Sequence, residues 1–175
     1  YMFFVYLEEA YKIDSEYVNY RDAKDRYSKH LGDTMNNFLE IEILDQEDPL
    51  TNSREGGVLE KDWSFVVSRA LEMEKFISEN SEGLNIKGYE YLKEHALWHY
   101  KYYVNLMLMG TSNNPIFSYQ TGEFDENAMN MYTEAAQKNP DTITAWALNE
   151  YFTYLDSINY KLNYKGKVAV VKKVS

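Results

Sequence analysis

Two histidines four residues apart are the clearest candidates for chemistry in this sequence. His95 and His99 would project from one face of a helix, because an α-helix completes a turn in about 3.6 residues. A metal ion held by two residues of a single helix requires this spacing. Glu94 adjoins the pair and offers an oxygen ligand. The sequence therefore predicts a metal site formed by His95, His99 and Glu94.

The alternative for these histidines is ordinary packing between helices. The chain has neither the His-Glu-x-x-His motif of zinc proteases nor the Glu-x-x-His motif of di-iron bundles. Its one other histidine, His30, is distant in sequence. The sequence leaves both interpretations open.

A run of acidic residues in the first third of the chain is a second candidate for cation binding. Hard cations such as Ca²⁺ prefer carboxylate oxygens, but the run lacks the alternating ligands and central glycine of an EF-hand. A solvated acidic face is the favoured interpretation. The 28 acidic residues also leave paired-carboxylate glycoside hydrolysis open, because spacing in sequence does not show which carboxylates meet. The run comprises Glu40, Glu42, Asp45, Glu47 and Asp48.

Motifs of several common enzyme classes are missing from the sequence. There is no Gly-x-Ser-x-Gly, no glycine-rich phosphate loop and no dinucleotide fingerprint. The absence of cysteine rules out disulfides, thiolate zinc sites and cysteine nucleophiles. These absences argue against serine-hydrolase, nucleotide-binding and Rossmann chemistry, and no cofactor is expected.

Tyrosine is unusually abundant, with 17 copies against 8 Phe and 3 Trp. A tyrosine combines an apolar ring with a hydroxyl, so tyrosines on neighbouring helices can line a groove for a sugar, a peptide or another helix. The alternative is core packing with the hydroxyls at the rim. The predicted ligand-binding residues are Tyr100, Tyr103, Tyr119, Tyr151 and Tyr154.

The elements that would position these residues are helices. Apolar residues recur at intervals of three and four along most of the chain, which is the period of one helix face. Asn139 and Pro140 are expected as the N-cap and first residue of the last helix. The segments 45–57 and 110–125 are predicted loops because they are rich in Gly, Pro and polar residues. The predicted helices cover about 3–30, 33–45, 59–80, 89–109, 126–138 and Pro140 to near Gly166. Alternatively, the first two ranges form one bent helix.

The helix over residues 89–109 is predicted to be the centre of the fold. Eleven of the fourteen residues from Ala96 to Met109 are apolar or aromatic. A helix that is apolar on nearly every side is usually enclosed by its neighbours. The alternative is that part of this surface binds a partner.

These patterns predict an all-α fold in a single domain. Residues 1–166 are expected to form a bundle of four to five helices. Residues 167–175 are expected to form a Lys- and Val-rich tail or a short C-terminal strand.

Charge and the first residues bear on partners and compartment. The net charge of −10 argues against nucleic acid as a partner, because phosphate binding needs a basic face. The apolar run from Tyr1 to Leu7 has two interpretations. It is either the start of a core helix or the last part of a signal or anchor segment that extends upstream of Tyr1. Seven residues cannot span a bilayer, which needs about 20. An extracytoplasmic or secreted location in a bacterium is favoured slightly over the cytoplasm.

The function expected from sequence alone is a non-catalytic binding or scaffold domain. Its partner would be a protein, a peptide or a small molecule. The alternative is a metal-dependent helical-bundle enzyme that uses His95 and His99 with nearby carboxylates.

Overall fold

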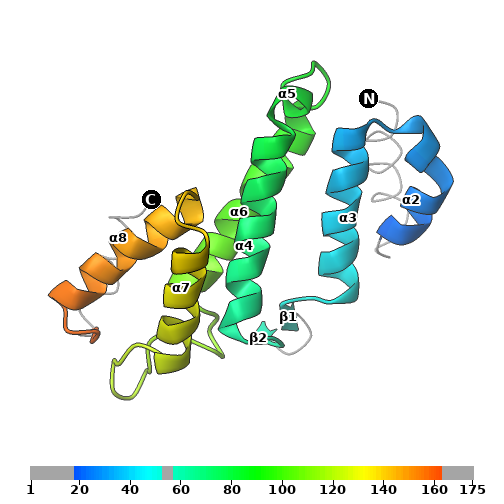
Figure 1. Ribbon diagram of the computed structural model, residues 1–175. Coiled ribbons are helices and arrows are strands. Elements are labelled where there is room, and N and C mark those ends of the chain that lie inside the picture. Colours follow the sequence, from blue (N-terminus) through cyan, green and yellow to red (C-terminus); the bar gives the residue numbers. More distant parts are fainter. Residues whose placement is uncertain (1–17, 53–56, 163–175) are drawn as a thin grey trace. The chain divides into compact units, whose positions relative to one another are not determined.

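The computed structural model describes residues 18–52 and 57–162, and these residues are mostly helical (Figure 1). They form seven α-helices, one 3-10 helix and a two-stranded antiparallel sheet, which confirms the predicted all-α fold class. The apolar run from Tyr1 to Leu7, the start of the first predicted helix and the tail 167–175 lie outside the described residues. The elements are α2 (Tyr20–Tyr27), η1 (Ser28–His30), α3 (Asp33–Glu47), β1 (Thr51–Asn52), β2 (Val58–Leu59), α4 (Trp63–Glu79), α5 (Ser81–Leu84), α6 (Glu90–Met109), α7 (Glu126–Lys138) and α8 (Ile143–Ser157).

The ends of the last helix differ from the prediction. Thr142, not Asn139, is the N-cap of α8, and its side chain accepts a hydrogen bond from a backbone N–H of the first turn. The helix ends at Ser157 rather than near Gly166. Asn159 and Tyr160 follow with φ values of 51° and 52°, a left-handed conformation that a right-handed helix cannot include. By contrast, Asp125 caps α7 where the sequence predicts it.

The chain divides into two compact units. Among the described residues, the first unit comprises 18–49 and 75–99, and the second comprises 50–52, 57–74 and 100–162. The predicted domain division at residue 166 stays a prediction.

In the first unit, α2 packs against α3, and polar contacts between the two helices hold α2 in place. The Gln46 side chain donates to the carbonyl of Val18 and accepts from the backbone N–H of Tyr20. Arg21 forms a two-pronged ion pair with Glu47. The buried face of α3 is apolar except for Glu42, and two of its side chains, Phe38 and Glu42, lie next to histidines of α6. The buried residues of α3 are Met35, Phe38, Leu39, Glu42 and Ile43.

In the second unit, α7 packs against α8, and buried hydroxyls hydrogen-bond to the backbone near the end of α6. The Tyr132 hydroxyl donates to the carbonyl of Met107 at 3.1 Å, and the Tyr151 hydroxyl donates to that of Leu108 at 2.8 Å. The Glu74 carboxylate accepts from two backbone N–H groups at the start of α8. These bonds satisfy polar groups that burial would otherwise leave without water.

The prediction that α6 is enclosed on every side is wrong. Tyr91 is 57% exposed and Trp98 is 59% exposed. Up to Tyr103 the buried positions follow the period of a single helix face, and only from Leu106 to Leu108 are three consecutive residues buried. Abundance of apolar residues therefore did not mean burial all round. The buried residues of α6 are Leu92, Ala96, His99, Tyr103, Leu106, Met107 and Leu108.

Within residues 18–52 and 57–162, no helix has the combination of length and apolar character needed to cross a membrane.

Candidate metal centre

Three ligand-type side chains converge in the first unit: Glu42 from α3, and His95 and His99 from α6. One ligating atom of each lies within 4.8 Å of the others. His99 Nε2 is 3.2 Å from His95 Nε2 and 3.3 Å from Glu42 Oε1. Two ligands on a tetrahedral zinc ion, with bonds of about 2.0–2.1 Å, are separated by about 3.3 Å. Two of the three separations, those from His99 Nε2, therefore already match the spacing that a shared zinc ion requires.

The helical period places these side chains together. His95 and His99 are one turn apart on α6, so both imidazoles share a face. Glu42 follows Phe38 by four residues on α3 and so takes a place on the buried face of that helix. A glutamate at a core position of an otherwise apolar face needs an explanation, because burying a charge costs free energy unless the charge is paired.

The Glu42 carboxylate is buried and incompletely satisfied. Glu42 is 5% exposed, and its Oε1 atom has no hydrogen-bond partner among the described residues. Burial raises the pKa of Glu42, as does the nearby charge of Asp45, while His99 and a hydrogen bond with Tyr20 act in the opposite direction. A cation bound at Oε1 would compensate for the lost hydration of this oxygen.

His95 is suited to binding a metal at neutral pH. Burial, and to a smaller extent the electrostatic effect of His99, lower the pKa of His95 to about 4. The ring is therefore neutral at pH 7, and a neutral imidazole has the lone pair that a metal ligand needs. The 3.2 Å separation from His99 also suits a direct hydrogen bond between the rings, in which one donates and the other accepts.

Asp45 supports His99 from the other side of the ring. Its Oδ2 lies 3.4 Å from His99 Nδ1. A carboxylate next to Nδ1 favours the tautomer with its proton on that nitrogen, which leaves the lone pair on Nε2. Nε2 is the atom close to His95 and Glu42, so Asp45 orients the ring as an outer carboxylate does in many zinc sites.

Aromatic rings surround the two imidazoles. The buried Phe38 ring lies 5.5 Å from that of His95 and 6.3 Å from that of His99. On α6, the rings of Tyr91 and Trp98 lie 5.7 Å and 6.2 Å from that of His95. The cluster thus lies between a buried phenylalanine and two largely exposed aromatic residues.

Only two of the three predicted metal ligands lie close together in the structure. The structure brings His95 and His99 together, but Glu94 is exposed and does not belong to the convergent group. Glu42 takes its place, and the signal that could have identified it is its position on the apolar face of α3. Metal binding itself stays a prediction.

The acidic run does not gather around one cation site of its own. Glu40 pairs with Lys24 and Glu47 pairs with Arg21, whereas Glu42 and Asp45 lie beside different nitrogens of His99. Among the described residues, only the group of Glu42, His95 and His99 brings three such ligands together.

The five predicted ligand-binding tyrosines do not form one surface. Tyr103 and Tyr151 are each 1% exposed, whereas Tyr119 is 45% exposed. Tyr100 and Tyr154 are half-buried, and the Tyr100 hydroxyl shares a hydrogen bond with a threonine of α8. Burial of Tyr103 and Tyr151 fits the alternative of core packing, and a binding role for the five stays a prediction.

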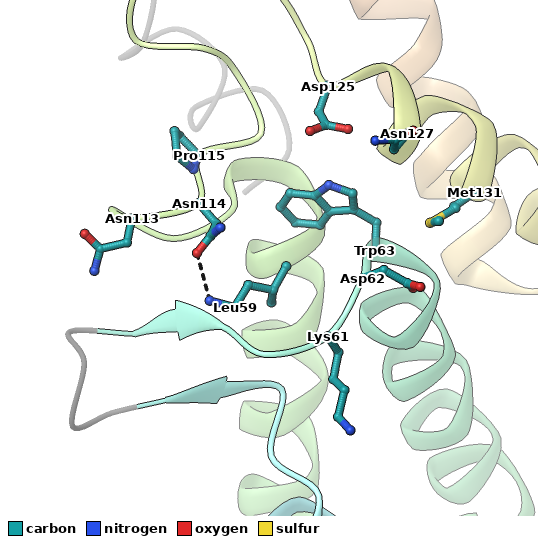
Figure 2. Close-up of a pocket in the computed structure, with 10 residues that line it drawn as sticks. All are labelled: Leu59, Lys61, Asp62, Trp63, Asn113, Asn114, Pro115, Asp125, Asn127 and Met131. Carbon is teal, nitrogen blue, oxygen red and sulfur yellow. Dashed lines mark hydrogen bonds between the residues drawn. The ribbon is translucent and has the colours of Figure 1, made fainter.

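An open pocket of about 430 Å³ in the second unit is the other candidate (Figure 2). Several polar side chains of this pocket accept hydrogen bonds from nearby backbone N–H groups and so hold local structure. Asn114 Oδ1 accepts from the backbone N–H of Leu59 at 2.8 Å. Asp125 and Asp62 accept from backbone N–H groups at the starts of α7 and α4. The pocket is lined by Leu59, Lys61, Asp62, Trp63, Asn113, Asn114, Pro115, Asp125, Asn127 and Met131.

No protein-family model, no curated protein and no solved structure matches this chain. The geometry of its own side chains is therefore the basis for a functional proposal.

Proposed function

We propose that this chain binds a divalent transition metal ion, with Zn²⁺ as the best fit, through Glu42 Oε1, His95 Nε2 and His99 Nε2. The proposal rests above all on the buried Oε1 of Glu42, which lacks a hydrogen-bond partner among the described residues and lies 3.3 Å from His99 Nε2. A dication at this point would pair the carboxylate and use both imidazoles.

The chemistry of the three ligands favours zinc over calcium or magnesium. Two imidazole nitrogens and one carboxylate oxygen suit Zn²⁺, Cu²⁺ or Fe²⁺, whereas Ca²⁺ and Mg²⁺ prefer sets made of oxygens only. Zinc also takes a tetrahedral geometry, whose ligand separations of about 3.3 Å match the distances from His99 Nε2 to His95 Nε2 and to Glu42 Oε1. The non-catalytic binding role expected from sequence is compatible with such a site.

The test compares two glutamates that differ in position only. Zn²⁺ is titrated into the metal-free protein by isothermal calorimetry at pH 7, using wild type, Glu42→Gln and Glu94→Gln. We expect one zinc ion per chain and a loss of affinity on the order of 10–100-fold or more in Glu42→Gln. Glu94→Gln should bind as wild type does, because Glu94 is exposed and outside the cluster.

Histidine variants provide the second arm. His99→Ala should weaken zinc binding at least as strongly as Glu42→Gln, since it removes a ligand. His30→Ala is the matched control, because His30 is exposed on η1 in the same unit. Equal zinc affinity in wild type, Glu42→Gln and His99→Ala would refute the proposal.

A further inference from the structure

The candidate centre offers three protein ligands, and zinc takes four. Structural zinc sites are closed by four protein ligands, whereas sites that bind or transform a small molecule keep one position for water or substrate. Asp45, the nearest further carboxylate on α3, lies 3.4 Å from Nδ1 of His99 and so on the far side of that ring from the ligating Nε2. Among the described residues, no fourth His, Asp or Glu joins the group.

His95 is the most exposed of the three candidate ligands. Glu42 and His99 are 5% and 8% exposed, while His95 is only half-buried. Tyr91 and Trp98 lie four residues before and three residues after His95, so they share its face of α6. Both are more than half exposed, and they form the aromatic rim of the accessible side.

The rim rings are oriented around the imidazoles. The Trp98 ring is stacked with that of His95 at an interplanar angle of 29°, and it lies edge-on to that of His99 at 5.2 Å. The Tyr91 ring is tilted by 38° against that of His95. The indole and the phenol therefore both lie within aromatic-pairing distance of His95, on the more exposed side of the centre, where a planar ring of a ligand could pack against them.

The charge of the metal-bound centre determines which sign of charge a further ligand should have. A dication together with its direct ligands, one carboxylate and two neutral imidazoles, has a charge of about +1, so an anionic donor suits the fourth position. Asp45, beside Nδ1 of His99, balances the remaining charge from outside the ligand set. A carboxylate oxygen can replace the metal-bound water without any bond breaking in the protein.

From these observations we infer that the centre keeps an open coordination position for a small aromatic carboxylate, with Tyr91 and Trp98 as the residues that select the aromatic ring. This inference rests on the proposed metal binding. The carboxylate would bind the metal at the fourth position, and its ring would pack against the exposed rim.

The experiment uses the full chain loaded with Co²⁺, whose visible spectrum reports changes in the coordination sphere. Acetate and benzoate are titrated separately into the Co²⁺ protein at pH 7. Both should change the spectrum, and benzoate should bind roughly 2- to 12-fold more tightly, the range expected of an aromatic pair. Trp98→Ala should remove most of this preference. Trp146→Ala is the matched control, since Trp146 is equally exposed but lies in the second unit.

Each outcome separates the two proposals. Absence of a protein-bound Co²⁺ spectrum overturns both. A Co²⁺ spectrum that neither acetate nor benzoate changes overturns the open position and leaves the metal site standing. Equal affinity for acetate and benzoate overturns the aromatic selection. Tyr91→Ala repeats the test at the other ring, and circular dichroism verifies that each variant keeps its helices.

Discussion

In the second unit the buried hydroxyls of Tyr132 and Tyr151 each donate to a backbone carbonyl, whereas in the first unit the buried Oε1 of Glu42 has no hydrogen-bond partner among the described residues. The same physical rule applies to both units, because a buried polar atom without a partner costs about 1–3 kcal/mol. The two tyrosine hydroxyls avoid this cost through local bonds. Glu42 Oε1 lies 3.3 Å from His99 Nε2, where a bound ligand could satisfy it. The difference separates polar residues that build the fold from those that are candidates for function.

The largest effect should follow from truncating a polar residue that builds the fold. Tyr132→Ala is expected to reduce the free energy of unfolding by about 3–5 kcal/mol, because the ring is fully buried and the Met107 carbonyl loses its donor. Urea denaturation measures the change. Tyr119→Ala, at an exposed tyrosine of the same unit, should change it by less than about 0.5 kcal/mol. A similar loss in both variants would contradict the distinction.

A smaller effect is expected at the start of α8. Glu74→Ala should cost about 1–2 kcal/mol, because the carboxylate accepts from the backbone N–H groups of Ile143 and Thr144 at 2.6 Å and 2.8 Å. Glu150→Ala, an exposed glutamate further along α8, is the control. Thermal unfolding followed by circular dichroism would reveal the difference, and a neutral Glu74→Ala would show that this carboxylate does not hold the helix start.

The pH dependence of stability should reveal His95. Its pKa is lowered in the folded state to about 4 from the ordinary 6.5, so the folded protein disfavours the protonated ring. The corresponding stability is present above pH 6.5 and is lost as the pH falls from 6.5 towards 4. We expect a loss of roughly 1–2 kcal/mol in the metal-free protein, after allowing for the partial exposure of the ring.

The control for this titration is the exposed histidine of the same unit. His95→Gln should flatten the stability profile between pH 6.5 and pH 4, while His30→Gln should leave it unchanged. A profile that is the same in wild type and His95→Gln would exclude His95 as the source of the slope.

The smallest effect should have the opposite sign. In the metal-free protein, Glu42→Gln is expected to leave the free energy of unfolding unchanged or raise it by about 0.5–1 kcal/mol. The reason is that the substitution removes a buried charge whose burial destabilises the folded state. Zinc should then stabilise wild type but not the variant. A clear loss of stability in metal-free Glu42→Gln would place this glutamate among the residues that build the fold.

Local patterns predicted much of this architecture from sequence. Helical periodicity gave the bounds of α7 and nearly those of α6, and the Asp125 cap follows from residue type alone. The pairing of His95 with His99 is equally local, because both lie on one helix. These features depend on residues within one or two turns of each other.

What the sequence could not supply depends on which helix faces meet. Glu42 joins the histidines only because α3 packs its buried face near α6, whereas Glu94 is adjacent in sequence but exposed. The exposure of Trp98 was missed for the same reason, since counting apolar residues does not show which face finds a neighbour. The end of α8 is followed by two left-handed residues, Asn159 and Tyr160. Asparagine is a type that adopts this conformation comparatively often, but tyrosine rarely does, so residue type signals only the first of the two.

X-ray absorption at the zinc edge of the loaded protein tests the metal centre most directly. The geometry predicts a shell of light atoms near 2.0–2.1 Å that includes two imidazoles, with loss of one oxygen ligand in Glu42→Gln. A shell made only of oxygens, or one that Glu42→Gln and Glu94→Gln leave equally unchanged, would show that the metal does not bind at Glu42, His95 and His99.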